Sequence, residues 1–252
     1  MSDAAIYGQE MFSLPHDVVV LPSKGKFYTQ KKESIKVGYL TAQDENILLS
    51  PNQTKDGLIN TLLRNKIYEP GFDINQLIDV DVQAVLIFLR NTSFGPEYTF
   101  YLRDPKNDEE FTAVVDLSEI TFKDFTLAPD EMGEFKFHFP KSNVDITFKF
   151  LTKKQLKEIE KIEESWNGIG VAPIVTKQLE MMIKSIAGNR DLMNIHNFVE
   201  QMPIKDSQDF RKFVKEHKPN LDLVKSVTAP SGELVNVEIG FGVEFFRPFY
   251  GV

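Results

Sequence analysis

Clusters of acidic side chains are the feature of this sequence that suggests catalysis or metal binding. They gather at Asp44-Glu45, at Asp108 to Glu110 and between Glu158 and Glu164, and paired carboxylates can hold a divalent cation or act as general acid and base. Each cluster also has a simpler interpretation. The first lies near a predicted helix start, where carboxylates favour the macrodipole, the second is a solvated turn, and the third alternates with lysines as an exposed helix face. A small hydrolase with an acidic site stays an alternative hypothesis, because proximity in space cannot be seen in one dimension.

Other catalytic and metal-binding patterns do not occur in the sequence. The four histidines are scattered without an H-x-x-x-H pair, and His138 lies in an alternating strand, where face residues outnumber ligands. Gly168-Ile-Gly-Val171 lacks the third glycine, the lysine and the preceding strand of a phosphate-binding loop, so we interpret it as a hinge between helices. We therefore expect no catalytic residue, no cofactor and no bound metal.

The C-terminal segment from Phe241 to Tyr250 carries five aromatic side chains in ten residues. Exposed apolar clusters are unfavourable and prone to association, so we expect this tail to dock, either on the core of its own chain or on another subunit. Aromatic and arginine side chains are typical interface anchors. The candidate partner-binding residues are Phe241, Phe245, Phe246, Arg247, Phe249 and Tyr250.

Composition limits the class of protein. The chain has 252 residues, 42% of them hydrophobic, and its 37 acidic against 29 basic residues give a net charge of −8. This charge would repel phosphate backbones, so we expect no nucleic-acid partner. The absence of cysteine excludes disulfides and thiolate metal sites. The N-terminus lacks a secretory signal pattern and no 18-residue apolar segment occurs, so we expect a soluble protein inside the cell and no membrane partner.

Hydrophobic periodicity predicts an α+β fold in the order β-α-β-α-β, because strands and helices do not alternate as in a doubly wound sheet. The clearest two-faced hairpin is Phe135 to Phe150, which alternates around a polar turn. We expect an N-terminal part over 1–151 and a helical part over 152–252, or one compact unit. Strands are predicted over 17–22, 35–40, 98–102, 111–115, 135–139, 144–150, 223–228 and 234–239, and helices over 41–50, 56–67, 82–90, 152–166, 175–187, 191–202 and 207–215, the last capped by Asp206.

Several segments together resemble one family. They are Leu21-Pro-Ser-Lys-Gly-Lys-Phe-Tyr28, Thr41-Ala-Gln-Asp-Glu-Asn-Ile-Leu48, Leu86-Ile-Phe-Leu-Arg-Asn-Thr-Ser-Phe-Gly95, Val115-Asp-Leu-Ser-Glu119 and Phe245-Phe-Arg-Pro248. In this order they resemble the baseplate hub and hub-assembly proteins of T4-like contractile-tailed bacteriophages, and the similarity is spread over nearly the whole chain.

The resemblance implies a role in building the central hub beneath the tail tube, as a small structural subunit or as an assembly chaperone, without catalysis. Its partners would be other baseplate hub and tail proteins, with a homo-oligomer left open, in the host cytoplasm during assembly or in the finished baseplate. The resemblance implies that some relatives carry Cys-x-x-Cys pairs where this chain has Asp104-Pro-Lys-Asn107 and Ala229-Pro-Ser-Gly232. Because this chain has no cysteine, we do not expect it to bind zinc at these two turns. A protein-binding module outside phages stays a further alternative.

Overall fold

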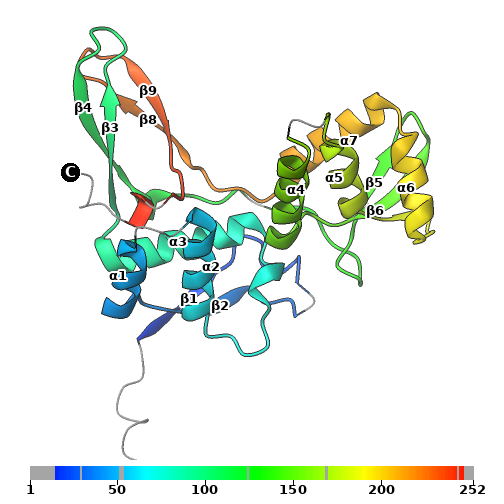
Figure 1. Cartoon of the computed structure of the whole chain (residues 1–252), viewed down its shortest axis with the longest axis horizontal. Coiled ribbons are helices and arrows are strands. Elements are labelled where there is room, and N and C mark those ends of the chain that lie inside the picture. Colours follow the sequence, from blue (N-terminus) through cyan, green and yellow to red (C-terminus); the bar gives the residue numbers. More distant parts are fainter. Residues whose placement is uncertain are drawn as a thin grey trace, which may run out of the picture.

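A computed structural model describes residues 15–28, 30–50, 54–123, 125–167, 170–242 and 244–246. The fold is α+β, as predicted, with small antiparallel sheets of two or three strands. Figure 1 shows two helical groups side by side, and a pair of hairpins projecting from the first of them.

The first helical group holds a layer of helices against a short hairpin. Helix α3 lies at its centre because Val82, Val85, Leu86 and Leu89 recur at helical spacing and are all buried. The antiparallel pair β1–β2 covers it, with Val19 opposite Ile35. The elements of this group are β1 (His16–Val20), β2 (Ser34–Gly38), α1 (Ala42–Leu49), α2 (Lys55–Lys66), η1 (Ile74–Gln76) and α3 (Asp79–Phe94).

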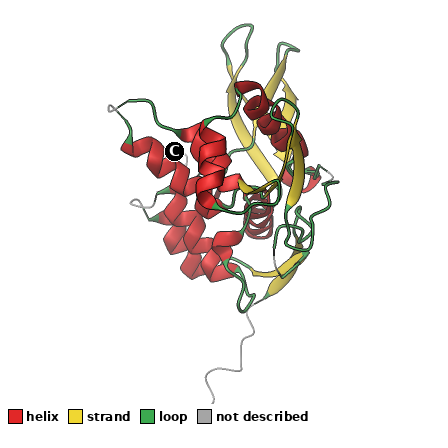
Figure 2. Ribbon diagram, turned by 90° about the vertical axis from the view of Figure 1, so that its right-hand side faces the viewer, coloured by secondary structure: helices red, strands yellow, loops and turns green. Residues whose placement is uncertain are grey.

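Two hairpins rise from this group and form the upper end of the molecule in both Figure 1 and Figure 2. Along β3 half-buried and exposed residues alternate, and Tyr98, Phe100 and Leu102 turn towards the core. The first hairpin is β3 (Glu97–Arg103) and β4 (Glu110–Asp116), followed by η2 (Leu117–Glu119); the second is β8 (Val224–Thr228) and β9 (Leu234–Glu238), followed by η3 (Glu244–Phe246).

The second helical group packs four helices around a three-stranded sheet in the order β5-β6-β7. Its interior is rich in phenylalanine, and Phe135, Phe139, Phe148 and Phe210 have almost no exposed surface. Such rings prefer edge-to-face contacts, as between Phe148 and Phe210, whose centroids lie 5.1 Å apart. The elements are β5 (Phe135–Phe139), β6 (Val144–Phe148), α4 (Lys153–Ser165), α5 (Ile174–Met182), β7 (Ile183–Ile186), α6 (Leu192–Glu200) and α7 (Ile204–His217).

Each group has its own hydrophobic core. The first core takes its buried residues from Val19 to Leu117 and again from Val237 to Phe246, whereas the second core takes them from Phe125 to Ile195, Val199 and Phe210. The chain therefore leaves the first core, builds the second and returns. Residue 151, the predicted boundary, lies within the stretch that builds the second core, and the division into two parts stays a prediction.

Two local predictions are wrong. The helix expected over 175–187 ends at Met182, and Ile183–Ile186 continues as β7 beside β6, with Ile186 opposite Ile146. The β-branched isoleucines suit an open strand edge, which tertiary pairing makes available. Asp206 does not cap α7, which begins after Pro203. Its carboxylate instead accepts hydrogen bonds from the backbone N–H groups of Lys141 and Ser142, at 2.9 and 2.8 Å. These bonds fix the turn between β5 and β6 to the start of α7.

Candidate interaction surfaces and the residues that shape them

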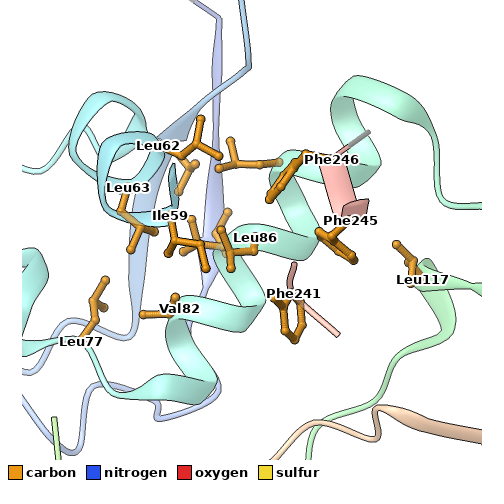
Figure 3. Close-up of a cluster of buried hydrophobic side chains, with 14 of the residues drawn as sticks. Ile59, Leu62, Leu63, Leu77, Val82, Leu86, Leu117, Phe241, Phe245 and Phe246 are labelled. Atoms are coloured by element: carbon orange, nitrogen blue, oxygen red, sulfur yellow. The ribbon is translucent and has the colours of Figure 1, made fainter. Parts of the chain in front are cut away.

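The aromatic tail packs on the first core of its own chain. Phe245 and Phe246 have no more than 2% of their surface exposed, and Phe241 is also buried. Figure 3 shows the three rings beside α3, with Leu86 on one side and Leu117 on the other. Arg247, Phe249 and Tyr250 lie outside the described residues.

The ring contacts show what the tail does in the folded chain. The centroid of Phe245 lies 5.0 Å from Phe241, 5.1 Å from Phe246 and 5.5 Å from Tyr98 at the base of the first hairpin. The tail thus closes the space between α3 and that hairpin. This is the intramolecular alternative of the sequence analysis, and binding of a partner by these residues stays a prediction.

The tips of the two hairpins lie side by side. The backbone N–H of Ser231 donates to Asp104 Oδ2 at 2.8 Å, and its hydroxyl donates to Oδ1 at 2.7 Å. The Ser231 hydroxyl thereby holds the pKa of Asp104 below its usual value. Ala229 and Gly232 offer no ligand side chain, and the Asp104 carboxylate is already occupied, so these turns do not fit zinc. Hydrogen bonds join them instead.

The segment Leu21 to Tyr28 forms a turn that is anchored on α3. It is held by Asp81 of α3, whose carboxylate accepts the backbone N–H of Ser23 at 2.9 Å and the hydroxyl of Tyr28. Burial raises the pKa values of both Asp81 and Tyr28, against the hydrogen bonds that stabilise the Asp81 carboxylate. The turn is therefore fixed to the centre of the first core.

Two further segments of the resemblance also have structural roles. Asp44 closes a capping box on Thr41, whose backbone N–H donates to it at 2.8 Å, and makes a buried ion pair with Lys66 at the end of α2. Arg90 is fully buried, and its guanidinium donates to the carbonyl oxygens of Gly95 at 2.6 Å and Glu97 at 3.0 Å. Gly95, with φ of +82°, provides the turn between them. These contacts join α1 to α2 and α3 to β3.

The acidic clusters do not converge on a shared site. Asp44 is used in the buried ion pair, while Asp108 and Glu110 pair with Arg103 at 3.0 and 2.7 Å on the exposed hairpin. Glu160, Glu163 and Glu164 line a shallow hollow of about 580 Å³ at the end of α4.

One group of possible metal ligands was missed by the sequence analysis. Glu180, His196 and Glu200 place ligand atoms within 4.8 Å of one another, although they are four to twenty residues apart on two helices. Lys177 already donates to Glu180 at 2.7 Å, and His196 contacts the other oxygen at 2.7 Å. An ion pair of this kind satisfies the carboxylate without a metal.

Exposed apolar side chains mark the faces that remain available to a partner. On the outer faces of the hairpins, Tyr101 is 79% exposed and Leu234 is 71% exposed, with Val114 and Val224 also exposed. Among the helices after Thr152, Leu192 begins α6 and Ile204 begins α7, and both are mostly exposed. These residues are candidates for contact with a partner because they are exposed apolar side chains on the surface of the protein.

Comparison with known proteins points to one family. Among the helices that the structure describes, none has the length and apolar character needed to cross a membrane. No curated protein and no solved structure matches the chain. The sequence profile of one family, described as T4 bacteriophage base plate protein, matches residues 15–247 and so covers both cores and both hairpins. The chain therefore belongs to the family of T4 bacteriophage base plate proteins.

Proposed function

We propose that this baseplate protein helps to build the central hub of the phage tail, either as a hub subunit or as an assembly chaperone, and that it acts by protein contacts without catalysis. The match to the baseplate family over residues 15–247 is the observation that carries the proposal. In this role it would be made in the host cytoplasm and would meet other hub and tail proteins there.

The exposed apolar residues of the projecting hairpins support a contact role. Tyr101 and Val114 share the outer face of the first hairpin, and Val224 and Leu234 are exposed on the second. A tyrosine that leaves water on binding combines a large apolar area with a hydroxyl that can form hydrogen bonds. We therefore expect these hairpin faces to be covered when the protein assembles.

Affinity capture from infected cells tests whether the outer faces of the two hairpins contact a partner. The tagged chain should retain hub and tail proteins, and Tyr101→Ser with Leu234→Ser should reduce their recovery at least about tenfold, as for the loss of interface anchors. Leu192→Ser with Ile204→Ser is the matched control, because it changes equally exposed apolar residues on α6 and α7. Capture without any tail component would contradict the proposed function, and loss only in the control would move the contact to the helices.

Mass spectrometry of purified particles then separates the two forms of the role. A hub subunit is recovered from finished particles in fixed stoichiometry to the other baseplate proteins. A chaperone is recovered from infected cells with its partners but is absent from the particles.

A further inference from the structure

A cleft of about 650 Å³ runs between the two helical groups. The first group contributes Tyr28, Phe72 and Gln76 to one wall, and the second group contributes residues from the segment after β6, from α4 and from β7 to the other. This volume is large enough for several side chains of a bound segment. A ligand in the cleft would contact both helical groups at once.

Three lysines on the wall of the second group make the cleft locally basic. Lys149 follows β6, Lys154 lies in the first turn of α4 and Lys184 lies in β7. Within the described parts of the chain, no carboxylate lies within ion-pair distance of any of the three. The nearby Glu134 carboxylate is bound by Arg190 through both oxygens, at 2.9 and 2.8 Å.

The electrostatics of this wall favour an anionic ligand. Burial lowers the pKa of Lys184 and the neighbouring positive charge of Lys149 lowers it further, whereas the Glu134 carboxylate raises it. The Lys184 ammonium also donates to the carbonyl oxygen of Met181 at 2.7 Å. Lys154 stands at the positive end of the α4 dipole, where a cation is unfavourable and an anion is favoured. An anionic group in the cleft would relieve both the repulsion between the lysines and the unfavourable placement of Lys154.

We propose that this cleft binds an acidic segment of a partner protein, a stretch rich in Asp and Glu whose carboxylates meet Lys149, Lys154 and Lys184. The inference rests on the proposed function for the existence of a partner and adds the chemistry of one contact. Gln30 and Gln76 are exposed and can bond the peptide groups of an extended segment, and Phe72 offers a half-buried apolar surface. The Gln155 side chain is held by Thr152 and by the carbonyl oxygen of Met181. Asp73 and Glu158 also line the cleft, so we expect the carboxylates of the segment to face the three lysines, and the net charge of −8 limits binding to a short acidic stretch.

Binding of a fluorescein-labelled hexaglutamate peptide to the full chain, followed by fluorescence anisotropy, tests the proposal. We expect saturable binding at about 0.05 M salt. The binding should weaken as the salt concentration rises, because salt screens the attraction between the lysines and the carboxylates of the peptide. Lys149→Gln with Lys154→Gln should weaken the affinity about tenfold or more, as expected when two charge-assisted contacts are lost. Lys205→Gln with Lys212→Gln is the control, because it removes the same charge from an exposed face of α7.

The possible results separate the alternatives. Absence of peptide binding, or equal weakening in the α7 control, would overturn the proposal. So would displacement of the peptide by inorganic phosphate at equal charge concentration, because that result indicates a small-anion site. If circular dichroism shows that the double variant is unfolded, Lys154→Gln alone replaces it, since this side chain is exposed. Capture of hub proteins from infected cells stays independent of all these results, so failure here and failure of the assembly role are distinguishable.

Discussion

At the residue scale, the buried ion pair between Asp44 and Lys66 should be the most sensitive polar contact of the first core. Both side chains are about 95% buried. Removing one partner of a buried pair leaves an uncompensated charge, which typically costs about 3 kcal/mol or more. We expect Lys66→Met to lower the free energy of unfolding by about this amount, measured by urea denaturation at neutral pH.

Two comparisons check that this loss comes from the charge. Asp44→Asn combined with Lys66→Met should recover part of the stability, because no charge is then buried alone. Burial raises the pKa of Asp44, but hydrogen bonds from Lys66 and Thr41 outweigh it and hold the pKa below 3.8. The stabilisation is therefore present above pH 3.8 and is lost as the pH falls through the lower folded value. A difference between wild type and Lys66→Met that persists in acid would contradict the assignment.

The residues of this pair also show what the sequence could and could not predict. Asp44 was correctly placed near the start of a helix, because Thr41 precedes it in a capping pattern. Its partner lies 22 residues later at the end of a different helix. No spacing rule joins two such positions, and the same holds for Tyr28 and Asp81, which meet across 53 residues.

At the element scale, the tail segment η3 should stabilise the first core through Phe245. The ring is fully buried among Phe241, Phe246 and Tyr98. Phe-to-Ala changes in a core cost about 3 to 5 kcal/mol, because they lose apolar burial and leave a cavity. We expect Phe245→Ala to lower the unfolding free energy by about that much, with a lower melting temperature in calorimetry.

A matched phenylalanine provides the control for the tail. Phe122 is 52% exposed, so Phe122→Ala should change stability by no more than about 0.5 kcal/mol. If Phe245→Ala leaves the stability unchanged but abolishes capture of hub proteins, the tail docks on another subunit and not on its own core.

Elements with strict alternation were predictable, whereas an element that depends on a distant neighbour was not. The hairpin from Phe135 to Phe148 follows the polar and apolar alternation of its sequence. Ile183 and Ile186 fit a helical face equally well, but the open edge of β6 converts them to a strand. The local pattern of apolar residues does not show that the edge of β6 will lie beside this segment.

At the scale of the whole molecule, Phe27 connects the two cores. It belongs to the turn that Asp81 holds in the first core, yet its ring lies 4.9 Å from Phe125 and 5.1 Å from Phe150 of the second core. The neighbouring Lys26 donates to the carbonyl oxygens of Phe125 and Leu127 at 3.0 and 3.2 Å. The return of the chain to its first core, and this connection, depend on contacts across about 100 residues, which the sequence pattern did not reveal.

If Phe27 couples the cores, Phe27→Ala should separate their unfolding. Trp166, the single tryptophan, follows α4 and reports on the second helical group, whereas far-ultraviolet circular dichroism reports on all helices. Coincident transitions by two probes indicate cooperative unfolding. We expect the two urea transitions to coincide in the wild type and to diverge in Phe27→Ala.

In the control Phe139→Ala, which alters the second core alone, both transitions should shift together to a lower urea concentration. Coincident transitions in Phe27→Ala would mean that the backbone connections and Lys26 suffice to couple the cores. In that case the Phe27 ring would not be needed to keep the two walls of the cleft, which is proposed to bind an acidic segment, at a fixed distance from each other.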